Sequence, residues 1–371
     1  MSRVLVIGRG MAGVAAALEA RAAGAEVTVV GAAPGATAFC GGVVWPESER
    51  DDGPPSGALQ GLFLACPKDA RCTDGWGELR EARLAQPAQA AGVLNPRAAT
   101  RGVAVVGFRG APQIQDAEGV AGALRAKGLN AQARELDLSL TTSEARRSPF
   151  EWATALDSRA ELDRFARALA RIARGDDLLL LPPILGINPE SFAGLSARSS
   201  SRIGELVASQ QSVPGLRLTR ALDARLERAG CQVVAGTVAS LVKGRAQLLS
   251  DQRATEPLHF DGAILATGRY LGGGVRRQGV FSEPVANLPL ALASGKPIDA
   301  NEPIERLVGD GPGQSAPAFE LGVSVDWEQH PVDADGRALP WLWAAGSIIA
   351  GPERGLAFAL RTGSAAGRAA A

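Results

Sequence analysis

A glycine-rich turn near the start of the sequence limits the folds that this chain can adopt. Residues 4–7 are apolar and lead directly into Gly8-Arg9-Gly10-Met11-Ala12-Gly13. An alanine-rich run over residues 14–23, then Gly24, and a second apolar run over residues 27–30 follow. This order predicts a strand, a helix and a second strand, with the glycines in the first turn. The spacing Gly-x-Gly-x-x-Gly at that position is typical of folds that bind a dinucleotide.

Each glycine has a physical task in such a turn. Gly8 permits the tight turn out of the strand, Gly10 lets a pyrophosphate approach the backbone, and Gly13 lets the helix pack on the strand. The free N–H groups and the positive end of the helix then bind the pyrophosphate. We therefore expect a nucleotide cofactor to be held by Gly8, Gly10, Met11, Ala12 and Gly13.

The second predicted strand lacks the residue that usually completes this site. Dinucleotide-binding folds normally carry Asp or Glu at its end, where the carboxylate binds the ribose hydroxyls. Here Val30 is followed by Gly31-Ala32-Ala33-Pro34-Gly35. Either the adenosine half of the cofactor is held in another way, or the cofactor has no adenosine half.

The composition excludes several classes of protein. A chain of 371 residues is long enough for two lobes, and 39 basic against 39 acidic residues give no sign of nucleic-acid binding. No apolar run approaches the about 20 residues that span a bilayer, and the first residues lack the layout of a signal peptide. We expect a cytoplasmic protein, peripheral on the inner face of the cell membrane only through partners.

The cysteines and histidines do not indicate a metal site. Cysteine occurs four times, without the C-x-x-C spacing of zinc or iron–sulfur ligands, and the only histidines are His259 and His330. We expect no metal in this chain. Any electron acceptor beyond an organic cofactor should then lie on another protein.

A second α/β pattern begins at residue 103. Residues 103–108 predict a strand, residues 116–127 a helix and residues 130–138 another strand, without a second Gly-x-Gly-x-x-Gly. Arg109 follows the first of these strands, and ligands of open α/β sheets gather at the carboxyl ends of strands. Arg217 lies in the first turn of a later predicted helix, where the helix dipole opposes its charge. Both are candidates to bind an anion, although solvated arginines would give the same pattern.

The end of the chain returns to the site that its start begins. Residues 260–268 predict an apolar strand ending in Ala-Thr-Gly, and residues 341–347 a strand ending in Gly-Ser, after which Gly355 opens a small-residue helix. Simple NAD-binding domains do not need this return. Flavoproteins of the two-dinucleotide-binding layout do, because the last helix points its positive end at the flavin ring. We expect a flavin, FAD or FMN, to contact Thr267, Gly268, Gly346, Ser347, Gly355 and Leu356.

Three weaker patterns lie elsewhere in the chain. Small residues at 36–45 would let the chain pass close to the flavin ring, which makes Thr37, Cys40 and Gly41 candidates for contact, although an ordinary loop fits equally well. Residues 77–85 predict a helical patch. Ser158 and Glu161 predict a capping box at the start of a helix whose buried face carries residues spaced by three and four.

Together these patterns predict an α/β protein with a Rossmann-like FAD/NAD(P)-binding fold. Its parts are a βαβ N-terminus, a C-terminal return segment and an inserted α/β lobe. We expect the flavin-binding domain to comprise residues 1–100 and 231–371. Residues 101–230 would form the inserted lobe, which would bind substrate or a partner.

Several segments beyond the glycine turn carry a family resemblance. They are Ala36-Thr37, Val105-Val106-Gly107-Phe108-Arg109-Gly110, Leu181-Pro182-Pro183-Ile184-Leu185-Gly186, Pro214-Gly215-Leu216-Arg217-Leu218, Ala266-Thr267-Gly268-Arg269-Tyr270-Leu271-Gly272-Gly273-Gly274 and Ala345-Gly346-Ser347. With these segments the chain resembles the B-type subunit of bacterial anaerobic glycerol-3-phosphate dehydrogenase. The resemblance implies oxidation of sn-glycerol 3-phosphate to dihydroxyacetone phosphate, with electrons passed through an iron–sulfur partner subunit to quinone. It also implies FMN as the cofactor and a hetero-oligomer with a second flavoprotein subunit.

The substrate phosphate would need arginines, and Arg217, Arg269 and Arg109 are the candidates. The sequence names no catalytic base, because neither histidine lies in a motif typical of one. A second hypothesis makes the chain a non-catalytic flavin-carrying scaffold or electron relay for a partner subunit. A third makes it an unrelated FAD-dependent amine or hydroxy-acid oxidase.

Overall fold

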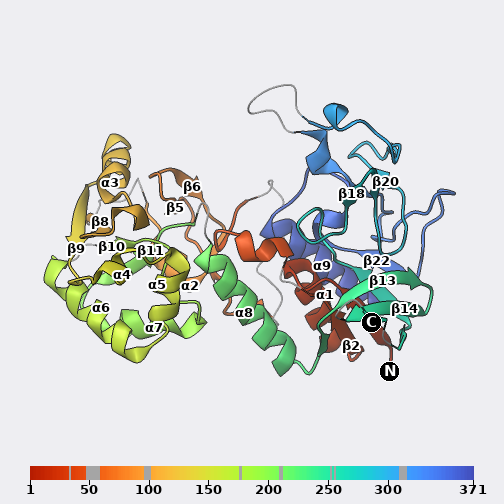
Figure 1. Cartoon of the computed structure of the whole chain (residues 1–371), viewed down its shortest axis with the longest axis horizontal. Helices are drawn as coiled ribbons and strands as arrows, with labels where there is room; N and C mark the ends of the chain where they lie inside the picture. Colours follow the sequence, from red (N-terminus) through yellow and green to blue (C-terminus); the bar gives the residue numbers. More distant parts are fainter. Residues whose placement is uncertain are drawn as a thin grey trace. The chain divides into compact units, whose positions relative to one another are not determined.

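The computed structural model describes residues 1–32, 35–46, 59–95, 102–174, 178–208, 212–250, 253–254, 256–308 and 316–371 (Figure 1). Two compact units divide them: the first holds Met1–Thr37 and Leu222–Ala371 with residues 59–60, and the second holds Ala38–Pro46 and Gly61–Ala221. The functional division into residues 1–100 with 231–371 and residues 101–230 stays a prediction. The compact units differ from it because residues 38–46 and 61–95 pack with the second unit.

The first unit is built on a parallel sheet of five strands in the order β12-β2-β1-β17-β22. This sheet, with α1 between β1 and β2, confirms the predicted Rossmann-like fold and the return of the chain's last segments to its first. The strands are β1 (Arg3–Ile7), β2 (Glu26–Val30), β12 (Gln232–Val234), β17 (Gly262–Leu265) and β22 (Leu342–Ala344).

Helices α1 (Met11–Ala22) and α9 (Leu356–Ala370) lie side by side in this unit (Figure 1). Their backbones come close because α9 presents glycines to α1. A Cβ added at Gly363 would lie 2.3 Å from the carbonyl oxygen of Ala12, and one at Gly367 2.3 Å from that of Ala16. The close packing of the two helices therefore requires glycine at 363 and 367.

Short antiparallel pairs surround this sheet. Strands β13 and β14 form an antiparallel hairpin with its turn at Lys243-Gly244, and β21 pairs with β20 over two residues, outside the main sheet. The remaining elements of this unit are β13 (Thr237–Val242), β14 (Arg245–Ser250), β15 (Arg253–Ala254), β16 (Leu258–His259), β18 (Arg276–Gln278), β19 (Val280–Ser282), β20 (Leu290–Ala291), η4 (Ile304–Arg306), η5 (Pro317–Glu320), β21 (Gly322–Val323) and η6 (Gly346–Ile348). The short helix η1 (Gly35–Phe39) begins in this unit and ends in the second.

The second unit has its own parallel sheet, in the order β11-β10-β8-β9, which confirms the predicted second α/β pattern. Its elements are β3 (Val43–Val44), β4 (Leu64–Ala65), β5 (Arg71–Thr73), β6 (Leu79–Glu81), β7 (Leu84–Ala85), α2 (Pro87–Ala91), β8 (Val103–Phe108), η3 (Pro112–Ile114), α3 (Ala117–Ala126), β9 (Ala131–Leu136), α4 (Thr142–Ala145), α5 (Pro149–Ala155), α6 (Arg159–Ile172), β10 (Leu178–Leu181), α7 (Pro189–Arg198) and β11 (Arg202–Glu205). Helix α8 (Val213–Arg228) begins in this unit and ends in the first.

The predicted helical patch at residues 77–85 is wrong, because these residues form the strands β6 and β7. Strand β6 pairs with β5, and β7 pairs with both β3 and β4. Leu84 and Ala85 are buried in these pairings. Tertiary pairing has overridden the local pattern, as it often does for short segments.

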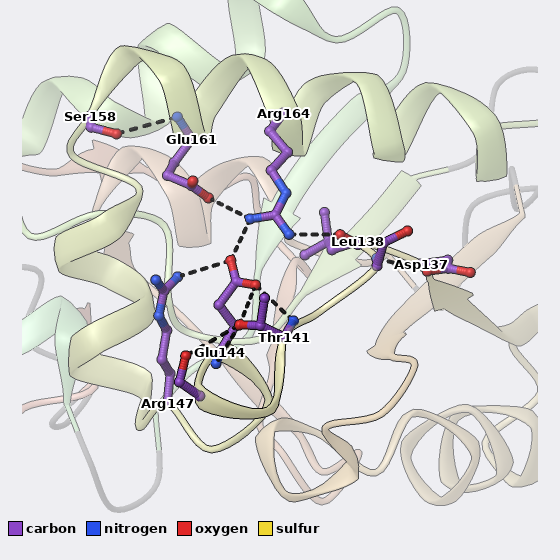
Figure 2. A network of polar contacts seen from close by, with 10 residues as sticks. Asp137, Leu138, Thr141, Glu144, Arg147, Ser158, Glu161 and Arg164 are labelled. Atoms are coloured by element: carbon purple, nitrogen blue, oxygen red, sulfur yellow. Dashed lines mark hydrogen bonds and ion pairs between the residues drawn. The ribbon is translucent and has the colours of Figure 1, made fainter.

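The capping box predicted at the start of α6 is only half formed. The Ser158 hydroxyl accepts a hydrogen bond from the Glu161 N–H, but the Glu161 carboxylate turns to Arg164, 3.3 Å away. Figure 2 shows why: Arg164 is held between Glu161, Glu144 and the carbonyl oxygen of Leu138. Glu144 in turn completes a capping box with Thr141 at the start of α4.

This network should make part of the protein's stability depend on pH. Arg164, followed by the N–H and hydroxyl of Thr141, lowers the pKa of Glu144 to about 2. An unfolded glutamate titrates near pH 4.3, so the ion pair stabilises the folded state above about pH 4.3 and loses its effect as the pH falls toward 2. We expect Glu144→Gln to lower the free energy of unfolding by about 1–2 kcal/mol at pH 6. Urea titrations from pH 6 to pH 3 should show this difference shrinking, and a constant difference would contradict the assignment.

Candidate functional site

The candidate site lies at the carboxyl edge of the five-stranded sheet in the first unit. Strand order makes β1 the switch point, because the chain continues from it to β2 on one side and returns to β17 on the other. Ligands of open α/β sheets bind outside the carboxyl ends of the strands at such a point.

Backbone contacts at the end of β1 allow only glycine. Gly8 has a φ of +120°, and an added Cβ would lie 2.1 Å from the carbonyl oxygen of Ala266. A Cβ at Gly13 would lie 2.0 Å from the carbonyl oxygen of Gly8. The glycine turn therefore packs closely against both the start of α1 and the segment after β17, which only residues without a side chain permit.

Thr37 is held against the first turn of α1. Its hydroxyl accepts a hydrogen bond of 2.9 Å from the N–H of Met11, and both residues are buried. Gly10, the residue that caps α1, supplies no side-chain hydrogen bond, and the first turn carries no acidic residue. The start of α1 thus keeps the positive character that a pyrophosphate requires.

The ends of β17 and β22 meet the same turn. A Cβ at Gly346, whose φ is +73°, would lie 2.7 Å from the Cβ of Ala12, and a Cβ at Gly268 would lie 3.7 Å from the hydroxyl of Ser347. The N–H of Gly346 donates to the hydroxyl of Thr362 on α9, 2.8 Å away. No local motif marks Thr362 in the sequence. The structure therefore brings the predicted segments of the two chain ends together.

The last predicted contacts lie where α9 begins. Gly355 caps this helix with a φ of +101°, and Leu356 is its first residue, as predicted. The first turn of α9 carries no acidic residue. Its positive end is available to stabilise negative charge.

These residues fit a flavin dinucleotide or mononucleotide. The glycines leave a cradle that any Cβ at Gly8 or Gly13 would disturb, and the buried hydroxyl of Thr267 has no hydrogen-bond partner within the described part of the chain. Buried polar atoms are normally paired, so this hydroxyl is available to a ligand. When bound, a flavin supplies the acceptor for a hydride.

Cys40 and Gly41 lie in the second unit. The main-chain oxygen of Cys40 accepts a hydrogen bond from Ser212, and burial raises the pKa of its thiol to about 11. A Cβ at Gly41 would lie 2.5 Å from a methyl group of Val207. Both are packed within their own unit, and their contact with a flavin stays a prediction.

Arg217 is already occupied by a carboxylate. Its guanidinium is buried and binds both oxygens of the buried Glu205, at 2.9 and 3.0 Å, and donates to the carbonyl oxygen of Gly186. The N–H of Leu185 and the amide of Gln89 also donate to Glu205. A substrate phosphate would have to displace this acid.

Arg109 lies at the end of β8, as predicted, but is exposed. It pairs with Glu135 at 3.4 Å and Asp137 at 3.2 Å, and all three side chains are more than half exposed. Such surface pairs contribute little. The structure favours the interpretation of Arg109 as a solvated side chain.

Arg269 differs from both, because it is buried and no carboxylate among the described residues forms an ion pair with it. Only 8% of the residue is exposed, and its Nη2 donates to the carbonyl oxygens of Ile349 and Gly351, each 3.2 Å away. Its Nε is buried and has no partner within the described residues. Burial lowers the pKa of Arg269, and the nearby charge of Arg354 lowers it further. Tyr270 and Glu320 raise this pKa, but by less.

Neither histidine is placed as an obvious base. His330 is buried with its Nδ1 2.9 Å from the carbonyl oxygen of Leu342 and its ring 4.9 Å from that of Trp343. His259 is exposed on β16. The catalytic base stays unassigned.

In the described ranges, no three His, Cys, Asp or Glu side chains gather as metal ligands would. The absence of a metal stays a prediction. In the same ranges, no helix combines the length and the apolar character needed to cross a bilayer.

Comparisons with known proteins agree with this geometry. The model of the family described as FAD dependent oxidoreductase matches residues 3–296. A protein of Pectobacterium atrosepticum, named as the B-type subunit of anaerobic glycerol-3-phosphate dehydrogenase, is 28% identical over 270 residues, which are 68% of this chain and 62% of that protein. A Halobacterium salinarum protein, named as a probable B-type subunit of the same enzyme, is 27% identical over 430 residues, 100% of this chain and 98% of that protein.

Among solved structures, a 3-ketosteroid dehydrogenase from Rhodococcus jostii is similar at 12% identity and a TM-score of 0.39, over 100% of this chain and 97% of that one. This likeness is too weak to carry an inference. The match to the Pectobacterium protein covers less than two thirds of that protein's length, at 62%.

Proposed function

The chain belongs to the family of FAD-dependent oxidoreductases, and on this premise we propose that it is a flavin-bearing subunit that oxidises sn-glycerol 3-phosphate to dihydroxyacetone phosphate. The names of its relatives support this substrate and a place in an assembly of several subunits. Electrons would leave through an iron–sulfur subunit to quinone. A second flavoprotein subunit would complete the assembly. The partner subunits would hold this chain at the membrane.

The observation that carries the proposal is the buried charge of Arg269. A buried cation without an acid is costly, and in the described chain no carboxylate forms an ion pair with this one. A phosphate would supply the missing charge and accept hydrogen bonds from two guanidinium nitrogens at once. Arg269 directly follows Gly268 of the flavin cradle, so the anion would be bound beside the cofactor.

The residues next to Arg269 support a binding and orienting role. The hydroxyl of Tyr270 donates to the carbonyl oxygen of Ala318 at 2.7 Å, which fixes the loop that carries Arg269. Gly351 and Ile349 hold one guanidinium nitrogen in place from the segment after β22. A fixed phosphate would orient the carbon that loses its hydride, and orientation of this kind lowers the barrier.

Replacing Arg269 tests the proposal. We expect Arg269→Gln to lower kcat/KM for glycerol 3-phosphate by about 100-fold, because truncating a buried charged partner costs about 3 kcal/mol. Arg269→Lys, which keeps the charge but not the planar fork, should recover part of this loss. Arg368→Gln, which removes an arginine of α9 that is 60% exposed, is the control and should leave kcat/KM unchanged. The measurement is steady-state oxidation by the reconstituted complex with a quinone acceptor.

Other outcomes would identify the rival functions. If the flavin stays oxidised in excess glycerol 3-phosphate, alone and in the complex, the proposed activity is wrong. If the complex is active and Arg269→Gln changes nothing, the chain is an electron relay for a catalytic partner. Turnover of an amine or hydroxy acid with oxygen and without partners would indicate an oxidase.

A further inference from the structure

The end of β2 has no acid to bind a ribose, but a charged residue, Arg9, lies beside it. Val30 ends the strand, and the N–H of Gly31 donates to the carbonyl oxygen of Val234 on the neighbouring chain segment. Gly31 has no side chain to occupy the space above the strand end. The residue that lies there comes from the glycine turn: a Cβ added at Gly31 would meet the Cβ of Arg9 at 3.0 Å and its N at 3.2 Å.

The guanidinium of Arg9 binds a carboxylate. Its Nε lies 3.2 Å from one oxygen of Asp223 and its Nη2 3.3 Å from the other. Asp223 belongs to the part of α8 that packs in the first unit, as does Arg9. A carboxylate far from Val30 in the sequence is therefore bound by the same residue whose Cβ faces Gly31.

The pair of Arg9 and Asp223 is half-buried, and the carboxylate of Asp223 can accept further hydrogen bonds. The side chain of Asp223 is 33% exposed and that of Arg9 21% exposed. Burial raises the pKa of Asp223, Glu227 adds to this effect, and the charge of Arg9 acts against it. Each carboxylate oxygen can accept about two hydrogen bonds, and among the described residues Arg9 donates one to Asp223, from Nη2, so acceptor sites remain free.

We propose that Asp223, positioned by Arg9, accepts the ribose hydroxyls of the adenosine half of the cofactor and takes the place of the missing acid at the end of β2. In dinucleotide-binding folds the carboxylate of that acid recognises the ribose. FMN has no adenosine half and gains nothing from Asp223. The chain therefore selects FAD over FMN, in contrast to the FMN implied by its family resemblance. This inference rests on the flavin site and is independent of the substrate.

Binding of FAD and FMN to the flavin-free protein, measured by calorimetry, tests this selection. The wild-type protein should bind FAD at least about 10-fold more tightly than FMN. Asp223→Asn should weaken FAD binding by about 10- to 100-fold, the effect of losing hydrogen bonds to a charged acceptor, and change FMN binding less than about 2-fold. Asp223→Glu should bind FAD more tightly than Asp223→Asn does.

Asp261→Asn is the matched control. It breaks another arginine–aspartate pair of the first unit, in which Asp261 binds the N–H and the guanidinium of Arg3. Neither flavin should bind differently to this variant. If wild-type protein binds FMN as tightly as FAD, or if Asp223→Asn weakens both flavins alike, the proposal is wrong and the pair only supports the fold.

A measurement on the wild-type protein covers the case in which Asp223→Asn does not fold. ADP carries the adenosine ribose without the flavin, and 2′,3′-dideoxy-ADP lacks both ribose hydroxyls. ADP should displace FAD at a concentration about 10-fold lower than the dideoxy compound does. Equal displacement by the two compounds would overturn the proposal. Because these experiments measure affinities, their results do not depend on whether the protein oxidises glycerol 3-phosphate.

Discussion

Glu205→Gln is expected to lower the stability of the second unit by about 3–5 kcal/mol, because it leaves the buried charge of Arg217 without its acid. The substitution keeps the shape of the side chain and an oxygen that can accept from the N–H of Leu185, so the lost charge dominates the effect. Hydrogen exchange of peptides from β10 would report this unit separately from the rest of the chain. The expected result is faster exchange by a factor of about 100 or more.

Two further variants separate the charge from the general effect of substitution. Glu118→Gln breaks an exposed pair with Arg125 in the same unit and should cost less than about 1 kcal/mol. Adding Arg217→Met to Glu205→Gln removes the unpaired charge and should restore part of the stability. A loss below about 1 kcal/mol for Glu205→Gln alone would show that the pair is not what holds this core.

Gly8→Ala is expected to destabilise the first unit by about 2–6 kcal/mol and to abolish flavin binding. The positive φ costs about 1–3 kcal/mol, and overpacking costs about 1–3 kcal/mol more, because the new methyl group would lie 2.1 Å from the carbonyl oxygen of Ala266. Relief of this contact must move the turn away from the segment after β17. Flavin content and the melting temperature of the purified variant are the measurements.

Gly24→Ala is the matched control in the same strand–helix–strand unit. Gly24 also has a positive φ, +95°, but nothing lies within 4 Å of an added Cβ. This variant should therefore show the backbone strain alone and keep its flavin. If both variants lose stability equally and both retain flavin, the close contact at Gly8 does not shape the site.

The flavin cradle could be predicted because its signals are local. The turn from Gly8 to Gly13 directly follows an apolar strand, and Gly268 and Ser347 each come at the end of another. Each motif can therefore be placed at the end of a strand from the neighbouring sequence alone. The return of the last strand to the first also follows from these endings. The position of β12 beside β2 carries no such signal, because three exposed or half-exposed residues give no clear period.

The charged partners could not be predicted, because they depend on distant contacts. Arg217 shows an unfavourable position in its helix, but its partner Glu205 ends a strand of four residues that no clear period indicates. Arg9 and Asp223 are 214 residues apart, and nothing in either neighbourhood points to the other. Residue type and helix dipole can indicate that a charge needs a partner, whereas only the fold decides which residue supplies it.

The contact of Gly363 with the backbone of Ala12 has a consequence for synthesis of the protein. About 350 residues separate the two, and at about 5–20 residues per second a ribosome needs about 20–70 s to deliver the second after the first. During this time α9 is not available to cover the face of α1 that it packs against, and for most of it β1 also lacks its later neighbour β17. The flavin site therefore cannot close until α9 has been made, so cofactor capture should follow the synthesis of this helix.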